Sequence, residues 1–514
     1  MRQKLRQLST DLAIYGLGDV AIQVVNFLLL SVYVRYLSPT DYGVLALLGS
    51  VEAITKLFFR WGVDGAFMRF WYDWEDQPSR QRLASTIFLF LLAVNGVLLV
   101  ASLIAAPLLS ARLLGDRSYA LALQLVLLNT FAIGFTFIPL HVLRMQNRAR
   151  EFSAIAFARS LSTLLLRILL VVGAGLGIMG VVWADIIVTV VLLGVMVPWF
   201  APLLRPLFSR QMLKDVLAFG LPRVPHGFAL QIMSVGDRFI LKLLRTPLDA
   251  IGVYSIGVSF GLIPKLALSA FEYAWAPFYY ATAREPGAQK VFSAVTTYGI
   301  AVLALFTAGL SAIARDLLDL VTHGQYVGAE GIVSWTAVGV FFYGIYLLTS
   351  IGLNITKNTQ FYPVSTAIGA AVNIGFNLVL IPRYGIIGAA WANGATYAIQ
   401  AAIAFTLAQR VYPITYERGR VARTLVAAAL AYAAAAMLPA MPPFAGVLAR
   451  GATVVMVMAA LLWSTKFFKT EELKALNALR LRRRQQPPVT PPPESVEMAG
   501  EIVGTDVQDE AIAR

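Results

Sequence analysis

The sequence contains no cysteine among its 514 residues. This absence excludes disulfide bonds, thiolate nucleophiles and cysteine metal sites together. The three histidines, His141, His226 and His323, lie far apart and show no metal-ligand spacing. The sequence shows no glycine-rich phosphate loop and no Ser/His/Asp set, so ATP drive and lipid-modifying catalysis have no support. We therefore expect a protein that is not an enzyme and uses no cofactor.

Charged residues are also scarce. Only 14% of the residues are charged, 58% are hydrophobic, and the mean hydropathy is +0.70. A chain of this length with this composition is too apolar to be soluble. Most lysines and arginines behind the net charge of +14 lie between apolar runs or near the C-terminus, as membrane topology requires. We expect a polytopic membrane protein without a nucleic-acid partner.

Apolar runs of about 20 residues predict about fourteen transmembrane helices. The expected spans are residues 12–34, 43–66, 83–109, 119–142, 153–175, 178–203, 217–243, 250–276, 291–313, 332–355, 362–381, 386–410, 421–441 and 444–465. Lysine and arginine are more frequent in the connections on the side of the N-terminus. This asymmetry predicts that both termini are cytosolic, and no cleavable signal is expected.

The chain repeats itself at an offset of 208 residues. The offset aligns Gly177-Ile178-Met179-Gly180-Val181-Val182-Trp183-Ala184 with Gly385-Ile386-Ile387-Gly388-Ala389-Ala390-Trp391-Ala392, and Asp64 with Glu272. Because an even number of helices returns the chain to its starting side, two six-helix repeats are parallel, and the substrate is expected between them. The predicted parts are a six-helix bundle (1–210), a second bundle (211–412), an added two-helix hairpin (413–466), and a basic, then proline-rich and disordered cytosolic tail (467–514).

A stripe of charge lies inside the second expected span. Glu52, Lys56 and Arg60 are four residues apart, which places them along one helix face over roughly 12 Å. A charged side chain at the bilayer centre costs about 2.5–3.5 kcal/mol, so the stripe should face a hydrated cavity. Glu52 and Lys56 fit an i, i+4 ion pair equally well. Arg60 has an acidic partner only if Asp64 reaches it.

Further charges are expected at membrane depth. Arg159 and Arg167 lie eight residues apart, and snorkelling is expected of Arg159, nearer the cytosol. Arg223 lies in a proline-rich break that should bend the seventh helix. Guanidinium and ammonium groups suit phosphate oxygens, so we assign substrate binding to Lys56, Arg60, Arg167 and Arg223. The candidates for ion coupling or pairing are Asp19, Glu52, Asp185 and Asp237.

Several motifs, in their order along the chain, carry a family resemblance. They are Leu37-Ser38-Pro39-Thr40-Asp41-Tyr42-Gly43, Gly62-Val63-Asp64-Gly65-Ala66-Phe67-Met68-Arg69-Phe70, Gly220-Leu221-Pro222, Asp237-Arg238-Phe239-Ile240-Leu241 and Leu248-Asp249-Ala250-Ile251-Gly252-Val253-Tyr254. With the two Gly-x-x-Gly-x-x-Trp-Ala segments, they resemble the polysaccharide (Wzx-type) lipid-linked oligosaccharide flippases. This family belongs to the multidrug/oligosaccharidyl-lipid/polysaccharide exporter superfamily. The resemblance covers residues 8–465.

The resemblance implies an all-α membrane fold with two six-helix bundles around a V-shaped cavity and two extra helices. It also implies alternating access that flips an undecaprenyl-diphosphate-linked glycan across the bacterial inner membrane, for O-antigen, capsule or exopolysaccharide synthesis. The implied partners are this substrate, membrane lipids, a glycan polymerase and glycosyltransferases. Three alternatives stay open: an ion-coupled exporter of drugs or metabolites, a lipid II flippase, and a non-transporting scaffold that docks glycan enzymes through the C-terminal tail.

Overall fold

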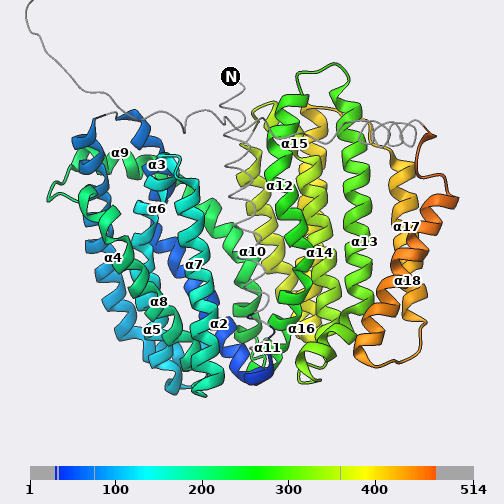
Figure 1. Ribbon diagram of the computed structural model, residues 1–514, viewed down its shortest axis with the longest axis horizontal. Coiled ribbons are helices and arrows are strands. Elements are labelled where there is room, and N and C mark those ends of the chain that lie inside the picture. Colours follow the sequence, from blue (N-terminus) through cyan, green and yellow to red (C-terminus); the bar gives the residue numbers. More distant parts are fainter. Residues whose placement is uncertain (1–28, 30, 32–33, 75, 359, 471–514) are drawn as a thin grey trace, which may run out of the picture. The chain divides into compact units, whose positions relative to one another are not determined.

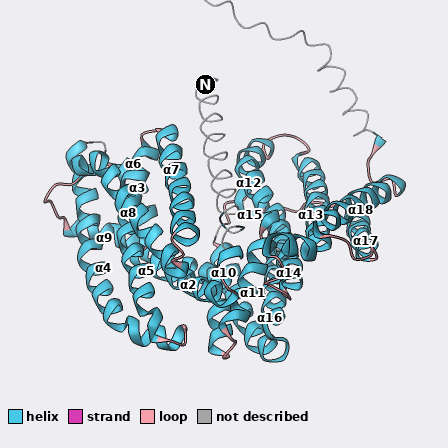
Figure 2. Cartoon of the chain, turned by 60° about the horizontal axis from the view of Figure 1, so that its bottom comes forward, coloured by secondary structure: helices cyan, strands magenta, loops and turns pink. Residues whose placement is uncertain are grey.

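The computed structural model describes residues 29, 31, 34–74, 76–358 and 360–470. Within these ranges the regular structure is helical and no strand occurs (Figure 2). The prediction of an all-α fold is therefore confirmed. The first expected span (12–34), with Asp19, lies almost wholly outside the described residues, as does the tail from residue 471.

Within the described part of the first expected half, helix α2 begins at a well-formed N-cap. The Ser38 hydroxyl accepts a hydrogen bond from the Asp41 backbone N–H, and the Asp41 carboxylate accepts one from the Ser38 N–H, while Pro39 occupies the first helical turn. The helices of this half are α2 (Pro39–Arg60), α3 (Val63–Asp73), α4 (Gln77–Leu113), α5 (Ala120–Ile133), α6 (Phe137–Met145), α7 (Ala149–Ile168) and α8 (Gly177–Phe200) (Figure 1).

The chain then passes through α9 into the second expected half. Its helices are α9 (Arg210–Gly220), α10 (Val224–Leu243), α11 (Leu248–Gly261), α12 (Ile263–Thr282), α13 (Ala288–Thr322), α14 (Ala329–Thr349), α15 (Ile351–Ile355) and α16 (Phe361–Val411). Two more helices, α17 (Arg418–Ala436) and α18 (Pro443–Ser464), fall in the region expected as an added hairpin. The predicted break in the seventh span is confirmed, because a 3₁₀ turn at Leu221–Arg223 separates α9 from α10.

Two further differences from the expected spans follow from backbone conformation. The span expected at 43–66 is divided into α2 and α3, because Trp61 and Gly62 both take positive φ values, 49° and 70°. Conversely, the eleventh and twelfth expected spans both fall within α16, where only Gly385 leaves helical geometry, with φ 61° and ψ −141°. Glycine tolerates that conformation without a Cβ clash.

Fewer helices qualify as membrane spans than the fourteen expected. Among the described residues, nine helices are long and apolar enough to cross a membrane, or ten if the bent pair α11 and α12 forms one span. The difference has three sources: the first span lies outside the described residues, two spans are counted together in α16, and α10 and α17 carry several charged residues. The chain is a multi-pass membrane protein.

The two expected halves meet mainly through α2, which packs against α10 and α11. Buried residues of this contact include Leu47 and Leu48 of α2 and Ile251 and Tyr254 of α11. Hydrocarbon lipid gives little hydrophobic drive for helix association, so close backbone approach at small residues matters here. This packing brings the C-terminal part of α2, which carries the charged stripe, alongside α10, where Phe58 contacts Phe228.

The residues from Leu461 onward form a separate compact unit. Its described part contains the last turn of α18 and a short segment up to residue 470, in which Trp463 and Phe467 each contact Phe468. The tail predicted at 467–514 lies mostly outside the described residues, so its basic and disordered character stays a prediction.

Candidate functional site

The charged stripe forms on α2 as its spacing predicts. Glu52, Lys56 and Arg60 lie in one continuous helix and are all partly buried. The Glu52–Lys56 ion pair, which the spacing allowed, is not formed. Within the described residues no carboxylate comes within 4.0 Å of the Lys56 ammonium. Lys56 therefore has no direct ion-pair partner at membrane depth, although the carboxylates of Glu52 and Asp64 are among its electrostatic neighbours.

Arg60 does have an acidic partner. Its Nη1 atom donates to Asp64 Oδ2 over 2.6 Å, across the break between α2 and α3. The buried Arg60 Nε has no hydrogen-bond partner among the described residues. Because a guanidinium offers five N–H donors, this pairing still leaves Arg60 with donors for a ligand.

Arg167 and Asp185 form a bidentate pair between α7 and α8. Arg167 Nε donates to Asp185 Oδ1 over 2.7 Å, and Nη2 donates to Oδ2 over 2.6 Å. Two parallel bonds of this kind fix both side chains more firmly than a single contact does. Arg167, expected to bind substrate, is thus placed beside Asp185, expected to couple ions or to pair.

A cavity of about 360 Å³ brings this pair together with Glu52 and Arg238. Its walls come from α2, α5, α7, α8, α10 and α11, so both expected halves contribute. Tyr42, Ser234, Ser255 and Ser259 add hydroxyl groups to the lining. The cavity therefore offers two guanidinium groups, two carboxylates and several hydroxyls, a combination that can hold a strongly polar ligand. It is the candidate functional site.

Asp237 lies behind this cavity and is 1% exposed. It accepts hydrogen bonds from the Tyr254 hydroxyl and from the Arg238 backbone N–H. The Arg238 side chain lies 3.4 Å from the same carboxylate and donates from Nε to Ser255 Oγ over 3.2 Å. Asp237 thus holds Arg238 in position while Arg238 faces the cavity.

Arg223 lies apart from the cavity lining, at the junction of α9 and α10. Its guanidinium stacks over Phe219 at 4.1 Å, and Arg69 lies over the same ring at 4.6 Å. A Cβ added at Gly65 would lie 3.0 Å from Arg223 Nη1. Because Gly65 directly follows Asp64, Arg223 lies close in space to the Arg60–Asp64 pair. Lys56, Arg60 and Arg223 therefore gather on one side of the structure, and Arg167 lies in the cavity beyond Glu52.

The sequence reading missed Ser234, Ser255, Ser259 and Arg238 as cavity residues. Ser255 and Ser259 are four residues apart in α11, a spacing that places both on one helix face and marks a polar face in an apolar span. The sequence analysis named Arg238 only as part of the Asp237-Arg238-Phe239-Ile240-Leu241 motif. The described residues contain no group of three His, Asp or Glu side chains arranged to hold a metal ion.

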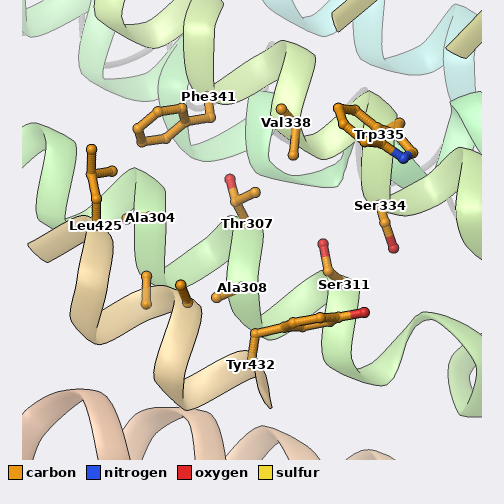
Figure 3. Close-up of a pocket in the computed structure, with 12 residues that line it drawn as sticks. Ala304, Thr307, Ala308, Ser311, Ser334, Trp335, Val338, Phe341, Leu425 and Tyr432 are labelled. Atoms are coloured by element: carbon orange, nitrogen blue, oxygen red, sulfur yellow. The ribbon is translucent and has the colours of Figure 1, made fainter. Parts of the chain in front are cut away.

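Another cavity, of about 350 Å³, lies between α13, α14 and α17 (Figure 3). Ser311 and Ser334 give it some polarity, and Trp335, Phe341 and Tyr432 provide large apolar surfaces. None of the charged residues predicted for the site lines it. This cavity is therefore not the candidate site.

Comparison with known proteins agrees with the architecture. The model of a family described as polysaccharide biosynthesis protein matches residues 32–325. The fold is similar to that of a lipid II flippase, MurJ, in an inward closed conformation, with a TM-score of 0.71 and 15% identity over 87% of this chain and 99% of that one. It is also similar to an inward-facing multidrug resistance MATE transporter, with a TM-score of 0.63 and 16% identity over 78% and 95%.

A sequence relative is an uncharacterised membrane protein of Methanocaldococcus jannaschii. It is 25% identical over 198 residues, which are 36% of this chain and 37% of the relative. The match thus spans little more than a third of the relative's length. The solved structures show a fold shared by flippases and exporters, and the family match extends over more than half of the chain.

Proposed function

Because the chain belongs to the polysaccharide biosynthesis protein family, a family of membrane flippases and exporters, we propose that it flips a lipid-linked oligosaccharide. The proposed substrate is an undecaprenyl-diphosphate-linked glycan, moved across the bacterial inner membrane for surface polysaccharide synthesis. The termini are cytosolic in this proposal. A glycan polymerase and glycosyltransferases are the proposed partners, because they would consume and supply this substrate.

The observation that carries the proposal is the pair of cations Lys56 and Arg60, which follow Glu52 along α2 and do not line the cavity themselves. Lys56 has no carboxylate within 4.0 Å among the described residues, and Arg60 retains a buried N–H donor without a partner. A partly buried cation without a direct ion-pair partner is costly at membrane depth. A diphosphate would supply the missing negative charge, and planar guanidinium groups match its oxygen atoms.

Aromatic side chains in the second half support a sugar as the rest of the cargo. Tyr343 and Tyr346 stack with ring centroids 5.9 Å apart, and Tyr397 packs edge-on to Tyr343 at 5.8 Å. Lys265 lies 5.5 Å over the Tyr343 ring, and the Tyr343 hydroxyl lies 3.4 Å from Glu272 Oε1. Tyrosines combine an apolar ring face, on which a sugar ring packs, with a polar hydroxyl for its edge.

The cavity explains how both halves would respond to the same cargo. Glu52, Arg167 and Asp185 come from the first half, whereas Arg238, Ser234 and Ser255 come from the second. A ligand that contacts both sets biases how the halves pack, which is the requirement for alternating access. The hydrocarbon tail would stay in lipid throughout, so only the polar head would need a hydrated path.

The test in cells is the double substitution Lys56→Ala and Arg60→Ala. We expect surface polysaccharide to be lost while the protein stays in the membrane at its normal level. The matched control is Arg112→Ala with Arg117→Ala, which removes two exposed charges at the ends of neighbouring spans, in the last turn of α4 and just before α5. Normal surface polysaccharide in the Lys56/Arg60 variant would contradict the proposal.

An ion-coupled exporter of small molecules is the second candidate. It is favoured by the carboxylates Glu52 and Asp185 in the cavity lining, because multidrug exporters of cationic compounds need an acidic lumen. Accumulation of a cationic dye in whole cells separates the two functions. An exporter predicts that removal of the gene raises dye accumulation, whereas the flippase predicts unchanged dye and lost polysaccharide. A lipid II flippase would instead show loss of cell-wall synthesis.

A further inference from the structure

A groove of about 530 Å³ runs between α7 and α8 on the face away from the cavity lining. Its walls are mainly apolar, with Leu165, Leu169 and Val191 among them. Leu169 and Val191 are 61% and 59% exposed, so this groove faces the hydrocarbon of the bilayer. An open apolar groove at membrane depth accepts a hydrocarbon chain.

Two polar side chains interrupt this apolar lining, and both are hydrogen-bond donors. They are Arg159 and Ser162, which lie three residues apart on the same face of α7. Within the described residues no carboxylate lies within 4.0 Å of Arg159. Ser50 and Thr130 bond back to the carbonyl four residues earlier, but the described residues give Ser162 no such bond. The groove lining contains no acidic residue, so its polar spot favours an anion.

The depth of Arg159 indicates which anion. It lies ten residues after the start of α7, about 15 Å along the helix. The helix and its terminal π turn, Ala149–Gly173, are slightly longer than a hydrocarbon core of about 30 Å, which places the Arg159 backbone about 10 Å inside that core. A resident phospholipid keeps its phosphate at the interface. A lipid that is being flipped carries its phosphate through this depth.

Arg159 also lies in the field of the charged stripe. Its electrostatic neighbours are Asp185, Glu52, Arg167 and Arg60, and Lys56 in turn has Arg159 as a charged neighbour. Arg159 of the groove is therefore near the charged groups in and beside the cavity, the carboxylates Asp185 and Glu52 first and the cations Arg167 and Arg60 after them. A single ligand can place its phosphates near Lys56 and Arg159 and its hydrocarbon chain in the groove.

We propose that the α7–α8 groove holds the polyprenyl chain of the carried lipid and that Arg159, with Ser162, binds its phosphate. The inference rests on the proposed function, since it takes the cargo to be a polyprenyl diphosphate. Snorkelling of Arg159, the expectation from sequence, does not account for the second donor at Ser162 or for the groove. The groove thus keeps the tail in lipid-like surroundings while the head enters the cavity.

The test measures binding of undecaprenyl diphosphate to the purified full-length protein in phosphatidylcholine nanodiscs. Arg159→Gln, which removes the charge, and Val191→Trp, which fills the groove, should each weaken binding about tenfold or more. The matched controls are Arg150→Gln on α7 and Val190→Trp on α8. Val190 is 60% exposed but does not line the groove, so it tests the effect of adding an indole to the same helix. Both controls should bind as the wild type does.

Each other outcome has a defined meaning. Arg159→Lys should retain part of the affinity and should melt as the wild type does. This variant separates the loss of a contact from the loss of folding.

Unchanged binding in both groove variants, or an equal loss in Val190→Trp, would overturn the proposal that the groove binds the lipid. Equal competition by phosphatidylglycerol would also overturn it, because the groove would then be a site for bilayer lipid. If the wild type itself fails to bind undecaprenyl diphosphate, the proposed function fails as well. If only Lys56/Arg60 variants lose binding, the groove alone fails.

Discussion

Gly43 of α2 and Gly252 of α11 face each other in a reciprocal contact. A Cβ atom at Gly43 would lie 1.9 Å from Leu248 O, and one at Gly252 would lie 1.9 Å from Pro39 O. In each helix, the oxygen that the partner's glycine would meet belongs to the residue four positions before that helix's own glycine: Pro39 before Gly43, and Leu248 before Gly252. A reciprocal contact of this kind is what two related elements make across a two-fold axis.

This contact predicts that Gly43→Ala destabilises the protein. The added methyl group would meet backbone, which cannot move aside as a side chain can, so we expect a loss of about 1–3 kcal/mol or more in the stability of the α2–α11 contact. Thermal unfolding in detergent measures the effect. Gly49→Ala, on the same helix with nothing within 4 Å of the new Cβ, is the control. Equal melting temperatures for the two variants would contradict the role assigned to this contact.

The pair of Arg167 and Asp185 predicts a double-mutant coupling. Either Arg167→Gln or Asp185→Asn leaves one charge in the cavity without its bidentate partner, whereas the double variant removes both charges. Each single variant should lower stability by about 1–3 kcal/mol, and the double variant should lose less than the sum. Thermal unfolding of all four proteins gives the coupling energy. Strict additivity would show that the two side chains act independently.

The N-cap of α4 predicts a contribution to the stability of the protein that depends on pH and comes from a group outside the membrane. The Ser79 backbone N–H donates to Asp76 Oδ2 over 2.8 Å, and hydrogen bonds from Ser79 hold the pKa of Asp76 below its ordinary value of 3.8. Because the folded-state pKa is lowered, the stabilisation is present above the ordinary pKa and is lost as pH falls through the folded-state pKa. The melting-temperature difference between wild type and Asp76→Ala should therefore be larger at about pH 7 than at about pH 2.5.

Asp76→Asn is the control for this prediction. Asparagine also caps helices but has no ionisable carboxyl group. The difference between Asp76→Asn and Asp76→Ala should therefore stay constant over the same pH range. If the melting-temperature difference between wild type and Asp76→Ala is also independent of pH, the charge of Asp76 contributes nothing to the cap.

The scaffold hypothesis predicts a different outcome for the C-terminal tail. Under the flippase proposal, a chain that ends at residue 470 retains the described helices and should support normal surface polysaccharide. A docking scaffold would lose its function on this truncation. Surface polysaccharide is measured at matched membrane levels of the full-length and the truncated chain. Its loss on truncation would contradict the proposal that the helical part up to residue 470 is sufficient for flipping.

Local features were predictable from sequence because they depend on helical periodicity. The spacing of Glu52, Lys56 and Arg60 placed them on one helix, and the glycine and prolines around Arg223 marked the break before α10. The bidentate pairing of Arg167 with Asp185 was not predicted, because the two residues are 18 apart on different helices and meet only when α7 and α8 pack. Arg238, Ser255 and Ser259 could not be predicted as cavity residues, because the cavity forms only where the two halves are in contact.

Conformational breaks were predicted less well for a physical reason. Hydropathy does not distinguish a glycine that continues a helix from one with positive φ. Gly62 and Gly385 both have positive φ, yet Gly62 ends a helix whereas α16 continues past Gly385 with only a kink. The tight contact of Gly62 with Gly220, in which an added Cβ would lie 2.3 Å from a backbone oxygen, forms between residues 158 positions apart. No local pattern reports such a contact.

The most direct test of the central claim is a flipping assay with purified protein in liposomes. The assay follows translocation of a polyprenyl-diphosphate-linked oligosaccharide in the wild type, in Lys56→Gln with Arg60→Gln, and in Arg112→Gln with Arg117→Gln. Removing two charge-assisted contacts to the diphosphate should slow flipping about a hundredfold or more, while the exposed-charge control keeps the wild-type rate. Wild-type flipping by the Lys56/Arg60 variant would contradict the claim that these cations hold the lipid's diphosphate.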